Sequence, residues 1–150
     1  MASVKFAPIV TRLVNQFGIT DLLDYGAGKG RLAHSIRPDH DLRVHNYEPS
    51  VDEWSDTPEP QQMVCCIDVL EHIEPDCLDD VLDDLKRVTK DLGVFSIHTG
   101  PAIKTLSDGR NAHLTQEPYQ WWLPKIWERF DMQLFSNTPG GFYVVVRPCP

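Results

Sequence analysis

The stretch LLDYGAGKGRLAHSI, residues 22–36, combines an acid with closely spaced glycines. An apolar run ends in Asp24, and glycines then occupy every second position of the range 26–30. Glycines between a strand and a helix let a ligand lie against the backbone, and the helix N-terminus attracts a carboxylate or a phosphate. The spacing differs from the GxGxxG of dinucleotide sites, because Arg31 stands at the third glycine position. No GKS or GKT follows, so the loop is not a P-loop.

A second acid, Glu48, stands at the end of the next strand-like segment, RVHNYEP. An acid in this place can accept hydrogen bonds from both hydroxyls of a ribose. A glycine loop alone is equally typical of a structural turn. The order strand, glycine loop, helix, strand and terminal acid favours a nucleoside-binding site instead.

A third group of polar residues follows the apolar run MVCCI. Asp68, Glu71 and His72 form D-x-x-E-H within one turn, and His113 lies in a later polar segment. One interpretation is a general base, His72 or His113, which Asp68 or Glu71 orients. The alternative is a metal site made of all four residues, suited to Mg²⁺ or a transition ion. We expect the four to be catalytic residues and expect no metal.

Strand-like and helix-like segments alternate along the chain, which predicts an α/β fold with a doubly wound, Rossmann-like sheet. The uniformly apolar run at residues 63–67 is typical of a central parallel strand buried on both faces. A polar segment, 101–116, is long enough for a lid or for an ordinary connection. The sequence predicts strands at 19–26, 43–49, 63–67 and 93–99, helices at 6–17, 29–37, 75–90 and 117–130, and a final antiparallel hairpin at 131–148.

The motifs DYGAGKG, NYEP and CCIDVLEHIEP together resemble those of the class I S-adenosylmethionine-dependent methyltransferases. The resemblance extends over nearly the whole chain and implies one domain over residues 1–150. It also implies a mostly parallel sheet that ends in an antiparallel hairpin. The segment TGPAIKTLSDGRNAHL and the following WW helix are similar to small uncharacterised phage and bacterial members. That similarity implies no particular substrate.

By this resemblance, three segments would bind S-adenosylmethionine. The family usually has a helix, a strand and another helix between the ribose acid and the next strand, where this chain has only residues 49–62. The region after the second strand is therefore shortened, and we hypothesise that Trp54 supplies a stacking wall for adenine. The alternative is that Trp54 only covers exposed core. The residues implied in cofactor binding are Asp24, Tyr25, Gly26, Ala27, Gly28, Gly30, Glu48, Pro49, Ile67, Asp68 and Val69.

Composition limits the partners of the 150-residue chain. Its net charge of −8 makes nucleic acid an unfavourable partner, since such partners usually require a basic surface. No apolar run approaches the length needed to cross a membrane, and the N-terminus lacks a signal-peptide pattern, so we expect a cytoplasmic protein. An exposed edge at the shortened side of the sheet would favour pairing, so the expectation is a monomer or a homodimer.

These observations together favour methyl transfer from S-adenosylmethionine to a hydroxyl or an amine of a small molecule or metabolite. One alternative is a catalytically degenerate module that binds the cofactor without turnover. A nicotinamide-dependent oxidoreductase is the second alternative, and Arg31 at the third glycine position speaks against it.

Overall fold

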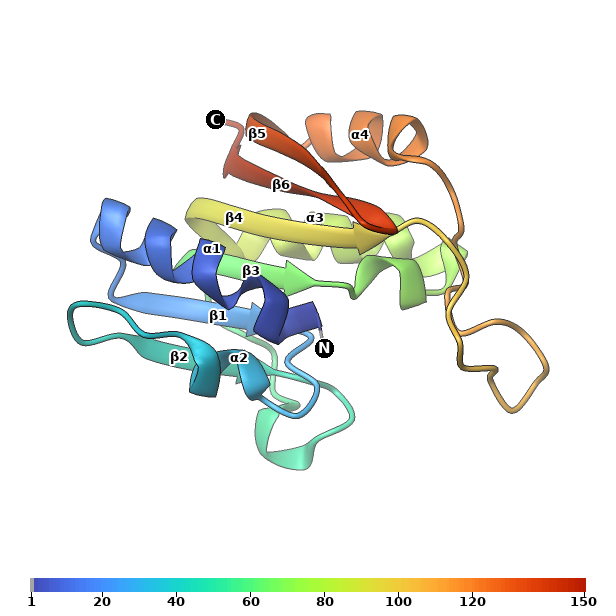
Figure 1. The fold of residues 1–150 in the computed structure, drawn as a ribbon, viewed down its shortest axis with the longest axis horizontal. Helices are drawn as coiled ribbons and strands as arrows, with labels where there is room; N and C mark the ends of the chain where they lie inside the picture. Colours follow the sequence, from blue (N-terminus) through green and yellow to red (C-terminus); the bar gives the residue numbers. More distant parts are fainter. Residues whose placement is uncertain (1) are drawn as a thin grey trace.

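The computed structural model describes residues 2–150, which form a six-stranded sheet with the order β2-β1-β3-β4-β6-β5 (Figure 1). Strands β1 to β4 pair in parallel, whereas β6 runs antiparallel to both of its neighbours, β4 and β5. The predicted Rossmann-like sheet with a C-terminal antiparallel hairpin is confirmed. The strands are β1 Asp21–Tyr25, β2 Arg43–Tyr47, β3 Gln61–Ile67, β4 Thr89–His98, β5 Phe130–Thr138 and β6 Gly141–Pro148.

Helices cover both faces of the sheet, so the protein has two apolar cores. Helices α1 and α2 lie over one face, and α3 and α4 pack against the other (Figure 1). Leu32 of α2 and Val10 of α1 belong to the first core, and Leu82 of α3 and Trp122 of α4 belong to the second. The helices are α1 Ala2–Phe17, α2 Arg31–Ser35, α3 Leu78–Val88 and α4 Tyr119–Trp127, with short 3-10 helices η1 Asp52–Trp54, η2 Leu70–His72 and η3 Pro75–Cys77.

The position of β3 in the middle of the sheet explains why its sequence is uniformly apolar. It pairs with β1 on one side and with β4 on the other. Its side chains alternate between the two cores: Cys65 packs on the α1 side and Cys66 on the α3 side, both fully buried. A strand covered on both faces has no solvent side on which polar residues would be favourable.

Two elements differ from the predicted bounds for local reasons. Helix α2 begins only after Gly30, because that residue has φ 73° and cannot continue a right-handed helix, and Ile36 is already extended before Pro38. Strand β4 begins at Thr89, four residues earlier than predicted. Thr89 is extended, which ends α3, and its hydroxyl donates to the carbonyl oxygen of Leu85 (2.6 Å).

The shortened region after the second strand is present as expected. Residues 48–60 connect β2 to β3 with only η1 between them, so β2 is an edge strand. From β1 the chain first adds β2 on one side and then crosses to add β3 on the other side. The point where the strand order reverses therefore lies between β1 and β3. Ligands of such sheets bind at the carboxyl ends of the strands beside this point. Within residues 2–150, no helix is long and apolar enough to cross a membrane.

Candidate functional site

The glycine loop is hydrogen-bonded to the end of β2. The backbone N–H groups of Gly26 and Ala27 both donate to the carbonyl oxygen of Tyr47, at 2.8 and 2.9 Å. The N–H of Gly28 donates to Glu48 Oε1 at 2.9 Å. Gly26 and Gly28 have φ values of 82° and 58°, in the left-handed region that favours glycine. Hydrogen bonds to the end of β2 and the left-handed glycines therefore fix the shape of the loop.

The three glycines have different surroundings. A Cβ on Gly26 would lie 2.5 Å from Val69 Cγ2, and one on Gly30 would lie 2.7 Å from Trp54 Cη2. A Cβ on Gly28 would meet nothing within 4 Å, although this residue lines a cavity of about 300 Å³. Packing thus accounts for the first and third glycines, whereas Gly28 keeps the cavity open.

Asp24 places an unsatisfied carboxylate beside this cavity. The residue is only 3% exposed, and its Oδ2 has no hydrogen-bond partner among the described residues. Burial, with a smaller contribution from the charge of Glu48, raises the pKa of Asp24 to about 7. Asp24 lines the cavity together with Gly28 and Lys29. A buried carboxylate without a partner is suited to binding a cationic group.

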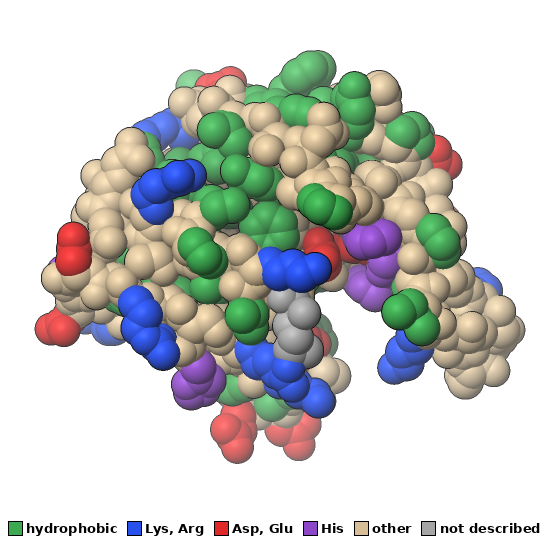
Figure 2. Space-filling view, in the orientation of Figure 1, with side chains coloured by type: hydrophobic (Ala, Val, Ile, Leu, Met, Phe, Trp, Pro, Cys, Tyr) green, Lys and Arg blue, Asp and Glu red, His purple; other side chains and the backbone are tan. Residues whose placement is uncertain are grey.

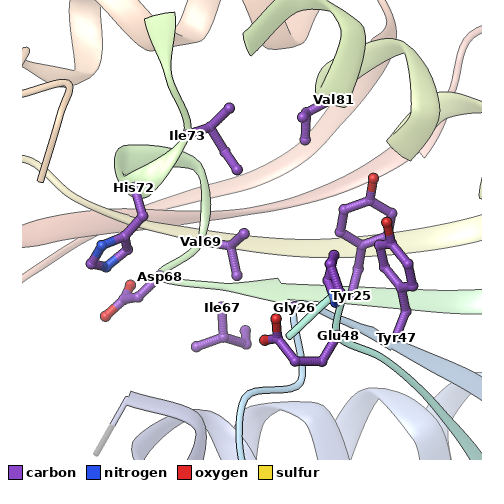
Figure 3. A pocket seen from close by; sticks show the side chains of 11 residues that line it. Tyr25, Gly26, Tyr47, Glu48, Ile67, Asp68, Val69, His72, Ile73 and Val81 are labelled. Carbon is purple, nitrogen blue, oxygen red and sulfur yellow. The ribbon is translucent and has the colours of Figure 1, made fainter. Parts of the chain in front are cut away.

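A second cavity, of about 390 Å³, lies on the α3 side of the same strand ends (Figure 3). Glu48 reaches into it from the end of β2, and its Oε2 accepts hydrogen bonds from the N–H and the hydroxyl of Ser50, at 3.3 and 3.1 Å. The remaining lining is largely apolar. It consists of Tyr25, Gly26, Tyr47, Pro49, Ile67, Asp68, Val69, His72, Ile73 and Val81.

Aromatic side chains line this cavity, but Trp54 is not among them. Trp54 packs against Gly30 instead, so its choice as the stacking wall is not supported. Tyr47 and Tyr25 lie side by side at the cavity, with ring centroids 4.9 Å apart (Figure 3). The hydroxyl of Tyr25 donates to Asp84 Oδ2 (2.7 Å), which fixes that ring to α3.

Asp68 lies where three cavities meet. It lines the two cavities described above and a third, of about 480 Å³. Its φ of 52° is unusual for a residue other than glycine. Ser96 stabilises this conformation, because its hydroxyl donates to Asp68 Oδ1 (2.8 Å) and accepts from the Asp68 N–H (3.0 Å). Such backbone strain is maintained at sites where a side chain needs a fixed position.

The third cavity lies between α1 and the end of β4. Lys5, His98 and Tyr143 bring polar groups to it, with Phe6 and Ile9 among the apolar lining. Sequence reasoning missed Lys5 and Tyr143. Ala2, Lys5, Phe6 and Ile9 share one helical face, so the signal that could have found Lys5 is a cation on an otherwise apolar stripe.

The histidines of the D-x-x-E-H motif and of the polar loop do come together. His72 and His113 have ring centroids 4.7 Å apart, and His98 lies 4.9 Å from His113. Figure 2 shows histidines gathered beside the hollow that separates the loop from the body. Partial burial and the neighbouring His113 lower the pKa of His72. Burial, followed by the charge of Asp68, raises the pKa of Glu71 to about 8.

The carboxylates do not orient these histidines as the sequence suggested. Nδ1 of His72 donates to the carbonyl oxygen of Ala112 (3.0 Å), and Nδ1 of His113 donates to that of Gly100 (2.7 Å). Glu71 Oε2 accepts instead from the backbone N–H of His98 (2.8 Å). Backbone carbonyls cannot be identified from side-chain patterns, so the sequence could not have supplied these partners.

The segment 101–116 is an ordered loop that projects from the sheet (Figure 1). The guanidinium of Arg110 near its tip donates to both oxygens of Glu74, at 3.0 and 2.8 Å. An isolated bridge between Thr105 and Asn111 closes the tip. No residue of the loop lines any of the three cavities, so in this conformation the loop covers none of them. Its contribution is His113, which lies beside His72 and His98.

Comparison with known proteins agrees with this geometry. The family described as "Methyltransferase domain" matches residues 3–136, so the chain belongs to this family. The resemblance to class I S-adenosylmethionine-dependent methyltransferases is thereby confirmed, and S-adenosylmethionine is the cofactor of that class. Comparison with curated proteins gave no match.

Solved structures share the fold at low sequence identity. The 1,6-didemethyltoxoflavin-N1-methyltransferase of Burkholderia thailandensis, solved with 1,6-didemethyltoxoflavin and S-adenosylhomocysteine, is 17% identical, with a TM-score of 0.66 over 99% of this chain and 79% of that one. The PH0226 protein of Pyrococcus horikoshii OT3 is 11% identical, with a TM-score of 0.70 over 97% and 90% of the chains. The mitomycin 7-O-methyltransferase MmcR is 14% identical, with a TM-score of 0.70 over 98% of this chain and 54% of its own, so this chain spans about half its length.

Proposed function

We propose that this protein transfers the methyl group of S-adenosylmethionine to a hydroxyl or an amine of a small molecule, and that residues 1–150 act as one domain. The observation that carries the proposal is the meeting of three cavities at Asp68. Two of them suit the two ends of the cofactor, and the third suits an acceptor. The solved relatives named for methylation of small molecules support this acceptor class.

The residues at the first two cavities fit S-adenosylmethionine chemically. Asp24 offers a buried carboxylate oxygen without a partner, which matches the ammonium of the amino-acid end. Gly28 leaves room for that end to lie against the backbone. Glu48 would accept hydrogen bonds from the ribose, since each carboxylate oxygen can accept more than one. The apolar cavity beside Tyr47 and Pro49 would take the adenine.

When bound, S-adenosylmethionine supplies a methyl group on a positively charged sulfur, which a nucleophilic oxygen or nitrogen displaces in line. The chain contributes mainly by positioning and by excluding water. Asp68 would orient groups at the junction of the cavities, because Ser96 holds its carboxylate in place. Where the acceptor must lose a proton, Nε2 of His72 and Nε2 of His113 are available, since each Nδ1 donates to a carbonyl.

The third cavity favours a small acceptor with polar groups. Lys5, His98 and Tyr143 offer a cation, an imidazole and a phenol within about 480 Å³. A cavity of this size matches those of small-molecule sites. A nucleic-acid acceptor is disfavoured by the net charge of −8.

An acceptor screen tests the proposed activity. The full chain is incubated with S-adenosylmethionine carrying a labelled methyl group and with hydroxyl- and amine-bearing small molecules, and products are identified by mass spectrometry. A labelled product is expected, and Asp68→Asn should lower its rate. Cofactor binding without any product across the panel would favour the degenerate binding module instead.

Glu48→Gln should weaken binding of S-adenosylhomocysteine by about 1–3 kcal/mol, because the amide cannot accept from the ribose and from Gly28 as the carboxylate does. Isothermal titration calorimetry measures the dissociation constant. Glu53→Gln, an exposed neighbour on η1, is the matched control and should bind as wild type does. Equal affinities of the two variants would show that Glu48 does not bind the cofactor.

A further inference from the structure

One cluster at the root of the 101–116 loop has the composition of a metal site. Glu71, His72 and His113 each place a ligand atom so that the three atoms lie within 4.8 Å of one another. Glu71 and His72 belong to η2, just after β3, whereas His113 comes from the returning arm of the loop. The fold therefore brings three potential ligands together from two segments of the chain.

The hydrogen bonds of the two histidines leave one nitrogen of each ring free for a metal. A carbonyl oxygen only accepts, so Nδ1 of His72, bonded to Ala112, and Nδ1 of His113, bonded to Gly100, both carry protons. Each Nε2 then has a lone pair. Metal-binding histidines commonly donate their other ring N–H to a backbone carbonyl in this way, which fixes the orientation of the ring.

In Glu71, likewise, one carboxylate oxygen makes a hydrogen bond within the protein and the other is free to bind a metal. Its side chain is fully buried, with an exposed fraction of 0%. Oε2 accepts from the N–H of His98 at 2.8 Å, whereas Oε1 has no partner among the described residues. A buried oxygen without a partner is unfavourable unless a donor or a cation satisfies it.

We propose that Glu71, His72 and His113 bind one divalent first-row transition ion. Two imidazoles and one carboxylate favour such an ion over Mg²⁺, which prefers oxygen ligands. The ligand set is smaller than the four residues considered from the sequence. Asp68 is outside the cluster, and its carboxylate accepts from Ser96 instead.

The place of the cluster gives the ion a role in the proposed methyl transfer, and this part rests on that function. His72 lines the cavity assigned to adenosine, and His98, beside His113, lines the cavity assigned to the acceptor. Three protein ligands leave a coordination position open, as in catalytic zinc sites. An acceptor hydroxyl bound there would lose its proton to water more readily. Its oxygen would then form the bond to the methyl carbon as the sulfur–methyl bond breaks, with S-adenosylhomocysteine as the leaving group, so the site favours hydroxyl over amine acceptors. The two histidines then act as ligands rather than as bases.

Metal binding is tested by titrating the chelator-treated full chain with Co²⁺, Zn²⁺ and Mg²⁺ by calorimetry, without cofactor. The absorption spectrum of Co²⁺ additionally reports whether a thiolate such as Cys77 is a ligand. We expect one Co²⁺ or Zn²⁺ per chain, much weaker Mg²⁺ binding and no thiolate band. His72→Asn and His113→Asn should each weaken binding by at least about 10–100-fold, because losing a ligand costs no less than losing the group that orients it. His34→Asn, an exposed histidine on α2, is the matched control and should change nothing.

His72 is partly exposed, so its substitution should leave the core intact, whereas His113 is buried, and circular dichroism verifies the fold of each variant. Absence of saturable Co²⁺ and Zn²⁺ binding would overturn the proposal, as would binding that survives both substitutions. Equal affinity for Mg²⁺ would overturn the choice of a transition ion. A parallel titration with S-adenosylhomocysteine separates this proposal from the proposed function. Cofactor binding without metal binding would contradict only the proposed metal site. Metal binding without cofactor binding would contradict only the proposed methyltransferase function.

Discussion

Gly28→Ala should weaken binding of S-adenosylhomocysteine by about a hundredfold or more, equivalent to roughly 3 kcal/mol. The added methyl group would meet no protein atom within 4 Å, so the loop itself has room for it. It would stand in the cavity that Asp24 and Gly28 line, where the amino-acid end of the cofactor would lie against the backbone. The dissociation constant from calorimetric titration measures the loss.

The control for this variant is Gly18→Ala. Gly18 has φ 61°, close to the 58° of Gly28, and a Cβ there also meets nothing within 4 Å, but the residue lies at the end of α1, outside the three cavities. Both substitutions should cost about 1–2 kcal/mol of stability through backbone strain. Only Gly28→Ala should lose the ligand. Wild-type affinity in Gly28→Ala would contradict the assignment of the glycine loop.

Asp24→Asn should have opposite effects on stability and on binding. Burial raises the pKa of Asp24 from its ordinary value of 3.8 to about 7, so the folded state binds a proton more tightly than the unfolded state does. Stability of the wild type should therefore fall as pH rises from about 4 through about 7, by about 2–4 kcal/mol. The neutral asparagine avoids this cost, and the variant should be more stable than wild type at pH 8. Denaturant unfolding at several pH values measures the difference.

Binding should show the reverse dependence on Asp24. An ammonium group needs the ionised carboxylate, whose population rises about tenfold between pH 6 and pH 8 if the pKa is about 7. Wild-type affinity for S-adenosylhomocysteine should rise over this range, and Asp24→Asn should bind weakly and without that dependence. Asp56→Asn, on the exposed connection after β2, changes the net charge equally and is the control. A variant that binds as tightly as wild type at pH 8 would show that Asp24 does not hold the ammonium.

Much of the fold follows from local patterns in the sequence. The uniformly apolar run that became β3 indicated a strand buried on both faces, and its pairing with β1 and β4 is the reason for that pattern. The shortened region after Glu48 could be expected from chain length alone, because residues 49–62 cannot contain a strand between two helices. Element ends were less predictable. Helix α3 ends where the backbone of Thr89 becomes extended, a local conformation that composition does not reveal.

The candidate site was predictable where its residues lie at the ends of consecutive parallel strands and unpredictable where helices and more distant strands meet. Asp24, the glycine loop and Glu48 lie on neighbouring strand ends, so their proximity followed from the parallel order β1 and β2. Lys5 lies on the apolar stripe of α1, and that pattern marks the residue as unusual, but the cavity that it lines exists only because α1 packs over the sheet. The positive φ of Asp68 likewise depends on Ser96, which comes from a different strand. Contacts of this kind arise from tertiary packing.

The central claim is that the glycine loop and Glu48 bind S-adenosylmethionine. Calorimetric titration of the full chain with S-adenosylhomocysteine, with NAD as the comparison ligand, tests it most directly. The account predicts saturable binding of S-adenosylhomocysteine in the micromolar range and none of NAD, since Arg31 occupies the third glycine position of a dinucleotide loop. Binding of NAD alone, or of neither ligand, would contradict it.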